Sequence, residues 1–365
     1  MTETTDVSDV SEVTDLASSP AMVPASAPVA ADRPVDRRRL VAALRTVALY
    51  LVTLWAVVTV VFVLPRMIPG DPLQALDQPD SGTYVYDAVV RAKVAAYYGL
   101  DKPLVSQYGS YLSGLRHGDL GWSISQNVPV RTLIVRRLPW TLLLMGGALA
   151  VSSVLGFVAG VAAAWRRGGH ADRALLVSLS AARAIPEYAM GIALLVGFAV
   201  FLPVFPQAGA KTPFAHYPTA FDAAGDVLRH LVLPLAALST GLVANKFLIV
   251  RNTMISTLGE DYMVLARAKG LPPRLVKYRH AGRNVLLPFL TVLGVQAGLA
   301  VGGSLLVEQV FAYPGMGSLT GNAVTARDYP LLQGGFLVLA VVTLLANLAI
   351  ELVYTRVDPR TAASR

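Results

Sequence analysis

The sequence contains no cysteine, which excludes structural disulfides, thiolate metal sites and a cysteine nucleophile. It also has no phosphate-binding loop of the form Gly-x-x-x-x-Gly-Lys-Ser/Thr, so this chain alone does not carry an ATPase site of that kind. The five histidines are scattered along the chain and no serine lies in a nucleophile-elbow motif. We therefore predict a non-enzymatic chain that binds no metal and no cofactor of its own.

Charged residues are scarce as well. They make up 15% of the 365 residues, whereas hydrophobic residues make up 54%, and a typical soluble domain has about 25% charged residues. The net charge of +8 comes mostly from basic residues in short segments that flank apolar runs. Membrane topology explains this pattern better than nucleic-acid binding does, so we predict a multi-pass protein in contact with lipid and with no nucleic-acid partner.

Six apolar runs are long enough to cross about 30 Å of hydrocarbon as helices. They cover residues 40–64, 139–165, 174–203, 230–250, 285–307 and 331–354. Basic residues flank alternate connections between these runs, as expected of the cytoplasmic side. The predicted fold class is therefore an all-α membrane protein with six transmembrane helices and both termini cytoplasmic.

The same pattern divides the chain into segments. Residues 1–39 are predicted to be a disordered cytoplasmic tail, 40–65 the first transmembrane helix, and 66–138 an extracytoplasmic subdomain. Residues 139–356 are predicted to hold the other five helices, with a cytoplasmic loop at 251–284, and 357–365 a C-terminal tail. Within the subdomain, residues 85–98 and 103–115 form amphipathic pieces, and the apolar residues Leu133, Ile134 and Leu138 suggest an interfacial helix.

Three polar residues fall inside or near predicted spans and are candidates for the translocation path: Glu187, Asn245 and Gln296. Polar groups in a membrane are expected to face the helix bundle or an aqueous path. For Glu187 and Gln296, an ordinary contact between helices is the alternative. The third run is about 30 residues long, so we expect Pro186 to kink it or its first turns to stand in the cytoplasm. Arg183 and Glu187 could pair across one helical turn.

The loop Gly259–Pro288 is the longest strongly basic segment between two apolar runs. A short helix is predicted at its start, because Glu260 and Asp261 favour a helix N-terminus and the residues Tyr262, Leu265, Ala266 and Lys269 share one face. Gly270 and the following Pro272-Pro273 pair are stop signals.

These residues resemble the cytoplasmic coupling loop of ABC importer permeases, in particular the dipeptide/oligopeptide/nickel branch. Further matches to that branch lie at 69–72, 118–123, 307–317, 327–330 and 358–360. The general importer pattern Glu-Ala-Ala is replaced here by Val264, Leu265 and Ala266, and Ile-x-Leu-Pro by residues 280–283. The peptide branch shows the same departure. The resemblance covers residues 40–360 and implies a type I importer bundle with an external subdomain between the first two helices.

The resemblance also implies partners. These are a homologous second permease subunit, two ATP-binding ABC subunits that hold ATP and magnesium, and an extracytoplasmic solute-binding protein, all at the bacterial plasma membrane. According to the resemblance, the small residue Ala266 lies where the short helix enters a groove of the ATPase subunit. The residues expected to couple the chain to the ATPase are Glu260, Asp261, Tyr262, Leu265, Ala266, Arg267, Ala268, Lys269 and Gly270.

The expected function is half of the translocation pathway of a peptide importer. Import of nickel chelates or oligosaccharides on the same scaffold is an alternative. An ion-gradient-driven carrier is a further alternative, although the sequence shows no obvious internal repeat and Glu187 is its one span-embedded acid.

Overall fold

The computed structural model describes residues 37–67, 92–93, 95–96 and 99–357, and leaves the side chains of some helix residues, 298–303 among them, undescribed. The predicted tail before residue 37, most of the amphipathic piece at 85–98 and the C-terminal segment after 357 lie outside the described residues. Contacts divide the chain into two units, Met1–Arg45 and Thr46–Arg365. The described part of the first unit is the start of helix α1, and the remaining described elements belong to the second unit.

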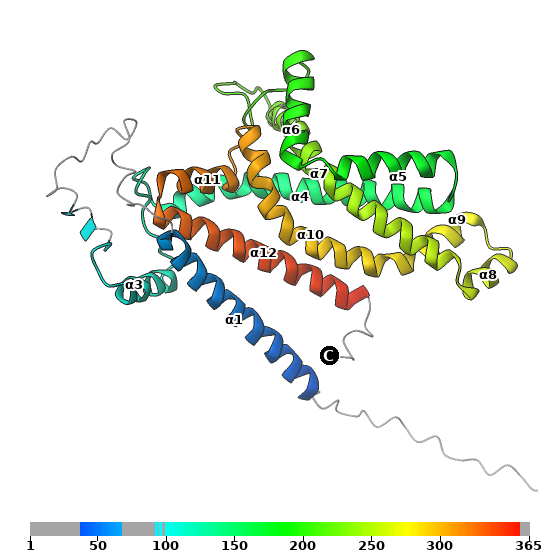
Figure 1. Ribbon diagram of the computed structural model, residues 1–365, viewed down its shortest axis with the longest axis horizontal. Helices are drawn as coiled ribbons and strands as arrows, with labels where there is room; N and C mark the ends of the chain where they lie inside the picture. Colours follow the sequence, from blue (N-terminus) through cyan, green and yellow to red (C-terminus); the bar gives the residue numbers. More distant parts are fainter. Residues whose placement is uncertain (1–36, 68–91, 94, 97–98, 358–365) are drawn as a thin grey trace, which may run out of the picture. The chain divides into compact units, whose positions relative to one another are not determined.

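The described residues are almost entirely helical (Figure 1), and their β pairing is limited to an isolated bridge between Trp122 and Pro129. The long helices are α1 (Arg37–Met67), α4 (Val130–Trp165), α7 (Ala220–Leu258), α10 (Gly282–Val310) and α12 (Tyr329–Val357). The shorter elements are α3 (Leu104–Arg116), α5 (His170–Arg183), α6 (Glu187–Leu195), η3 (Val196–Phe201), α8 (Asp261–Ala268), α9 (Pro273–Leu275), η4 (Val276–Ala281) and α11 (Met316–Ala326), of which η3 and η4 are π-helical.

Three buried apolar clusters follow one another along α4. The first joins the start of α4 to α11 and α12 through residues such as Ile134, Leu319 and Leu331. The second joins the middle of α4 to α7 and the end of α10, and the third joins the end of α4 to α7, α8, η4 and the start of α10. Figure 1 shows α11 and α8 at opposite ends of these long helices. The bundle therefore has one packed layer at each end and one in the middle.

Two glycines on α4 let α7 approach closely. A Cβ added to Gly156 would lie 2.6 Å from the Cβ of Lys246, and one added to Gly160 would lie 2.7 Å from the Cβ of Val250. These glycines are four residues apart, which is the small-residue spacing that favours close packing of membrane helices. The composition of the second run predicts this role, and the structure identifies α7 as the partner.

Replacing Gly160 by alanine is expected to destabilise the α4–α7 pair by about 1–3 kcal/mol, the usual cost of overpacking. The matched control is Gly146→Ala on the same helix, where an added Cβ would meet no atom within 4 Å. Thermal unfolding of the purified chain in detergent would compare the two variants. Equal melting temperatures for both would contradict the assigned packing.

Several element boundaries differ from the sequence-based expectation. Helix α1 runs through Pro65 to Met67. Helix α4 is continuous through Pro139, so the predicted interfacial helix at Leu133 and Ile134 is its first part, buried against α11 and α12. In both helices the proline removes one backbone hydrogen bond without ending the helix.

Helix α7 is longer at both ends than the predicted run 230–250. Its N-cap is Thr219, whose hydroxyl accepts a hydrogen bond from the backbone N–H of Asp222, while the Asp222 carboxylate accepts from the backbone N–H of Thr219. This capping box is visible in the sequence as Thr-x-x-Asp. Residues 220–229, which precede the predicted run, are therefore helical, as are residues 251–258 of the predicted cytoplasmic loop.

The third run is broken. Helices α5 and α6 meet at the segment Ala184–Pro186 with a bend of 100°. The effect of Pro186 is thus confirmed, and the break is far sharper than a kink, because a proline at this position ends α5 and caps α6. Arg183 is the last residue of α5 and Glu187 the first of α6, so the expected pairing across one helical turn is wrong.

By length and composition, four described helices could cross a membrane, or five if the bent α5–α6 pair is one span. They coincide with the predicted runs at 40–64, 139–165, 230–250, 331–354 and, for the bent pair, 174–203. Helix α10 covers the remaining predicted run. The all-α membrane fold is confirmed, whereas the number of six spans stays a prediction.

Candidate functional site

The predicted short helix of the basic loop is present as α8 (Asp261–Ala268), which begins at the predicted acidic residues and ends before the stop signal Gly270. The backbone of Glu260 is extended, and its carbonyl accepts a hydrogen bond from the N–H of Met263 at 2.9 Å. Asp261 lies in the first turn, where a carboxylate interacts favourably with the helix dipole. Gly270 follows with φ +70°, a left-handed conformation that suits glycine, and its surroundings are open. The stop signals therefore act as predicted.

One side of α8 is buried in the protein's own core. Met263 is 0% exposed and Ala266 is 7% exposed. Met263 belongs to the third apolar cluster, together with Val161 of α4, Met254 of α7 and Val285 of α10. Because protein interiors are closely packed, a displacement of α8 would disturb its contacts with these three helices.

The opposite side of α8 is exposed and partly apolar. Val264 is 60% exposed, Leu265 is 56% exposed and Tyr262 is 40% exposed. Among the residues expected to share one face, Tyr262, Leu265 and Lys269 are exposed, whereas Ala266 faces its own chain. Adjacent apolar side chains on a loop helix are the kind of surface that marks a protein-protein contact. Sequence reasoning had not assigned Val264 to the site, although this residue occupies the first position of the Glu-Ala-Ala motif of importers.

The remaining predicted coupling residues frame this surface. Glu260, Asp261, Arg267, Ala268 and Gly270 are all exposed. After Gly270, Pro273 starts the helical segment α9, which continues as η4 into α10. The amide of Asn284 donates a hydrogen bond to the hydroxyl of Tyr262 at 2.6 Å, so the start of α10 holds the exposed face of α8 directly.

The end of α7, just before α8, is attached to α5 by an ion pair. The Arg251 guanidinium donates from Nε to Asp172 Oδ1 at 2.6 Å and from Nη2 to Asp172 Oδ2 at 2.8 Å. Asp172 also accepts a hydrogen bond from the backbone N–H of Gly168 at 2.9 Å and is 2% exposed. This two-point contact fixes the turn between α4 and α5 to the helix that leads into the loop.

Replacing Arg251 by methionine is expected to lower the free energy of unfolding by about 3–5 kcal/mol, because it leaves the Asp172 carboxylate buried without its partner. The double variant Arg251→Met with Asp172→Leu should recover much of this loss, since neither charge is then buried. Thermal unfolding of the single and double variants checks the prediction. If the double variant is no more stable than Arg251→Met, the pair does not act as described.

The three predicted translocation residues are not brought together into one site. Glu187 is half-buried on the first turn of α6, with its carboxylate beside Gly241 of α7. Asn245 is partly exposed on α7. Gln296 of α10 is 4% exposed, and neither its amide oxygen nor its amide nitrogen has a hydrogen-bond partner among the described residues. Their role in translocation stays a prediction.

A buried lysine lies next to Asn245, and the sequence-based prediction had not assigned it to the translocation path. Lys246 is 0% exposed, and its Nζ donates a hydrogen bond to the hydroxyl of Ser152 on α4 at 2.6 Å. A lysine within an apolar helix is expected to reach an interface or a neighbouring helix, and here it reaches the neighbouring helix. The contact reinforces the close α4–α7 packing at Gly156.

At the α11 end of the bundle, two fully buried carboxylates bind backbone and hydroxyl groups. Glu308 accepts hydrogen bonds from the Thr141 hydroxyl at 2.8 Å and from the backbone N–H of Ser318 at 3.0 Å. Asp328 accepts from the backbone N–H of Ser125 at 2.9 Å and from the Ser123 hydroxyl at 2.5 Å. The motif 118–123 and the segment 307–330 are thus held together by structural hydrogen bonds.

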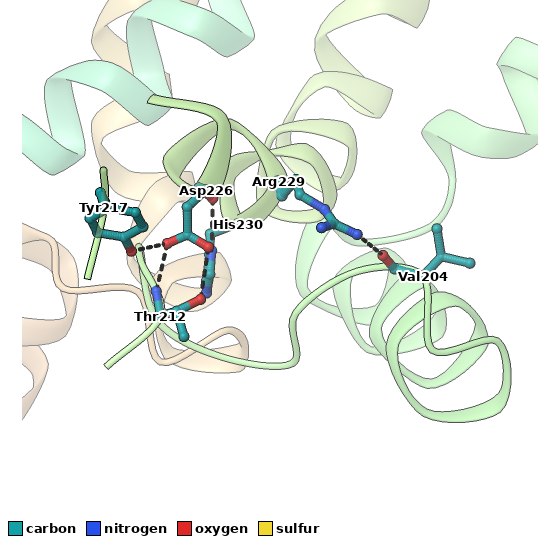
Figure 2. A network of polar contacts seen from close by, with 6 residues as sticks. All are labelled: Val204, Thr212, Tyr217, Asp226, Arg229 and His230. Atoms are coloured by element: carbon teal, nitrogen blue, oxygen red, sulfur yellow. Dashed lines mark hydrogen bonds and ion pairs between the residues drawn. The ribbon is translucent and has the colours of Figure 1, made fainter. Parts of the chain in front are cut away.

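A further polar network fixes the connection between η3 and α7 (Figure 2). Asp226 accepts hydrogen bonds from the backbone N–H of Thr212 at 2.7 Å and from the Tyr217 hydroxyl at 2.6 Å. Donation to Asp226 raises the pKa of Tyr217 above its usual value. The ring of His230 lies 2.8 Å from the backbone oxygen of Asp226, one turn along α7. The network uses groups of the chain itself, and it has the character of a loop anchor rather than a ligand site.

An all-α bundle with several helices that are long and apolar enough to cross a membrane defines an integral membrane protein. The family model for binding-protein-dependent transport system inner membrane components matches residues 156–363. The chain belongs to this family and is a component of the inner membrane.

Relatives with known names extend the match over most of the chain. The di/tripeptide transport system permease protein DppB of Pseudomonas aeruginosa is 35% identical over 334 residues, which cover 88% of this chain and 98% of the relative. The dipeptide transport system permease protein DppB of Escherichia coli K12 is 33% identical over 333 residues, 87% of this chain and 97% of the relative. The glutathione transport system permease protein GsiC of Escherichia coli is 33% identical over 307 residues, 84% of this chain and 94% of the relative.

Proposed function

We propose that this chain is a permease subunit of an ATP-driven importer of short peptides. The observation that carries the proposal is the exposed apolar face of α8, formed by Tyr262, Val264 and Leu265 on a helix whose other side is embedded in the bundle. The named relatives, which transport dipeptides, tripeptides or glutathione according to their names, support peptide as the cargo.

In this proposal each of two ATP-binding subunits grips one coupling loop, one on this chain and one on a homologous second permease subunit. Closure of the ATP-binding subunits, with ATP and magnesium between them, moves α8. Met263 passes the movement to α7 and α10 through the third apolar cluster, and Asn284 adds a direct link from Tyr262 to α10. The ion pair of Arg251 with Asp172 extends the connection to α5. The cargo reaches the permease from an extracytoplasmic solute-binding protein.

Uptake tests the proposal. Cells that carry the complete transport system should accumulate a radiolabelled dipeptide in an ATP-dependent manner, and deletion of this chain should abolish the accumulation. Uptake that persists when ATP is depleted but a proton gradient is maintained would favour the ion-gradient-driven carrier. Accumulation of a nickel chelate or an oligosaccharide in place of the dipeptide would keep the ATP-driven mechanism and overturn the cargo.

A further inference from the structure

A cavity of about 400 Å³ lies between the end of α1, helix α3 with the segment that follows it, and the start of α12. Its lining includes the cation of Arg66, the hydroxyl-bearing ring of Tyr111, the aromatic side chains of Trp122 and Tyr329, and the amide of Gln333. Sites for small molecules commonly have this size and this mixture of aromatic walls with a few convergent polar groups. None of these residues belongs to the coupling loop.

Arg66 is held in a fixed orientation. Its Nε and Nη2 groups both donate to Gln107 Oε1, at 3.1 and 2.9 Å, and its Nη1 group donates to the backbone oxygen of Phe62 at 2.7 Å. Its guanidinium carbon also lies 3.7 Å from the centre of the Phe62 ring. These contacts use three of the five N–H donors of a guanidinium. The other two have no partner among the described residues, and Arg66 lines the cavity.

Arg66 also has no acidic partner among the described residues, although it is half-buried. Asp119 is the one described acid that lines the cavity, and its Oδ1 accepts a hydrogen bond from the backbone N–H of Gly121 at 2.9 Å. Lys102 adds a second positive charge to the lining. A partly desolvated cation without a counter-ion is costly, and a bound anion would offset that cost.

Two further polar groups in the lining are unsatisfied. The Tyr111 hydroxyl and the Gln333 amide nitrogen are buried and have no hydrogen-bond partner among the described residues. Gln333 is only 7% exposed. Burial raises the pKa of Tyr111 to about 12, so its hydroxyl keeps its proton at neutral pH. Buried polar groups are nearly always paired in native proteins, so unpaired donors at one cavity indicate an acceptor that is supplied by a ligand.

We propose that this cavity binds the carboxylate group of a short peptide, with Arg66, Tyr111 and Gln333 as its hydrogen-bond donors. A carboxylate is a planar acceptor that matches a guanidinium and can accept further hydrogen bonds at both oxygens. The rings of Trp122 and Tyr329 provide apolar walls for an adjacent side chain. The peptide nature of the ligand rests on the proposed function, whereas the recognition of a carboxylate rests on the cavity alone.

Binding of radiolabelled alanyl-alanine to the full-length chain in phosphatidylcholine nanodiscs tests the site. Unlabelled alanyl-alanine should displace the label, and alanyl-alanine amide should do so at least about tenfold less well, since hydrogen bonds to charged groups are the strong ones. Tyr111→Phe and Gln333→Leu should each weaken binding of alanyl-alanine by about tenfold or more. Both substitutions preserve side-chain volume, so the fold is expected to survive.

Tyr108→Phe is the matched control. Tyr108 lies one turn before Tyr111 on α3, but its hydroxyl is paired with the Thr59 hydroxyl at 2.8 Å and it does not line the cavity. Its substitution should change binding less than twofold, by roughly 0.4 kcal/mol. Thermal unfolding without ligand provides the second readout. Gln333→Leu removes an unpaired buried donor and should not lower the melting temperature, whereas the loss of an amide with a structural role would lower it.

The outcomes separate the site from the proposed function. Three results would overturn the site. Alanyl-alanine does not bind, alanyl-alanine and its amide bind equally well, or Tyr111→Phe and Gln333→Leu both leave binding unchanged. A further result is that phosphatidylglycerol in the nanodisc displaces the labelled peptide, with alanyl-alanine and alanyl-alanine amide equally effective as competitors. That result would assign the cavity to lipid and would also overturn the proposed peptide site. If the dipeptide binds with the expected dependences but the complete system does not import it, the site stands and the import proposal fails. If both variants import and bind the dipeptide normally, the import proposal stands and the site fails.

Discussion

Replacing Leu265 by glutamate is expected to lower ATP-driven uptake by at least about 30-fold, the equivalent of losing roughly 2 kcal/mol from the interface with the ATP-binding subunit. Leu265 is 56% exposed on the apolar face of α8. A carboxylate there would be desolvated against an apolar surface without a partner. The stability of the chain itself should change by less than about 0.5 kcal/mol, because the side chain is at the surface.

Leu265→Met is the matched control for this variant, since methionine keeps an apolar side chain of similar volume and should support near-normal uptake. Uptake of a radiolabelled dipeptide and thermal unfolding of the purified chain are measured for both variants. Normal uptake by Leu265→Glu would refute the docking role of this face. A large loss of stability would show instead that Leu265 belongs to the core.

Replacing Met263 by alanine is expected to lower both stability and uptake. Met263 is 0% exposed in the third apolar cluster, and removal of a fully buried methionine side chain costs about 2–5 kcal/mol. Loss of this contact frees α8 from α7 and α10, so movement of the helix is no longer passed into the bundle. The combination of lost stability with lost uptake distinguishes Met263 from Leu265.

Val264→Ala controls for the Met263 variant. Val264 is the next residue on the same helix and is 60% exposed, so its truncation should change stability by less than about 0.5 kcal/mol. Melting temperatures compare the two variants directly. Equal melting temperatures would mean that α8 is not seated on the bundle through Met263.

Ala266 illustrates what the sequence could not decide. The resemblance placed this small residue where the helix enters the ATPase groove, but in the structure it is 7% exposed and faces its own chain. A bulky Ala266→Trp side chain would therefore first disturb the packing of α8 against its own chain. Helical periodicity assigns residues to a face, but on so short a helix it does not say which face the rest of the chain covers.

Other features were predictable because they depend on local chemistry. The bounds of α8 follow from its acidic start and from Gly270, and the break in the third run follows from Pro186. The long apolar runs predicted the positions of the main helices. The capping box at Thr219 is also recognisable in the sequence as Thr-x-x-Asp, and it would have predicted the start of α7 correctly.

Contacts between distant segments could not be predicted in the same way. The pairing of Arg251 with Asp172 joins residues 79 positions apart, and the Lys246–Ser152 contact spans 94 positions. Nothing in the local sequence selects one partner among the available polar residues. The unpaired donors around Arg66 are likewise visible only once α3 and α12 are placed beside the end of α1.

The most direct test of the account is a photo-cross-link from the exposed face of α8. A benzoylphenylalanine at position 265, in the assembled transport system, should form a covalent adduct with the ATP-binding subunit, and the yield should change when ATP is added. The same group at Phe214, a fully exposed residue of the loop before α7, should give no such adduct. Absence of the adduct from position 265, or equal yields from both positions, would contradict the central claim that α8 is the docking helix.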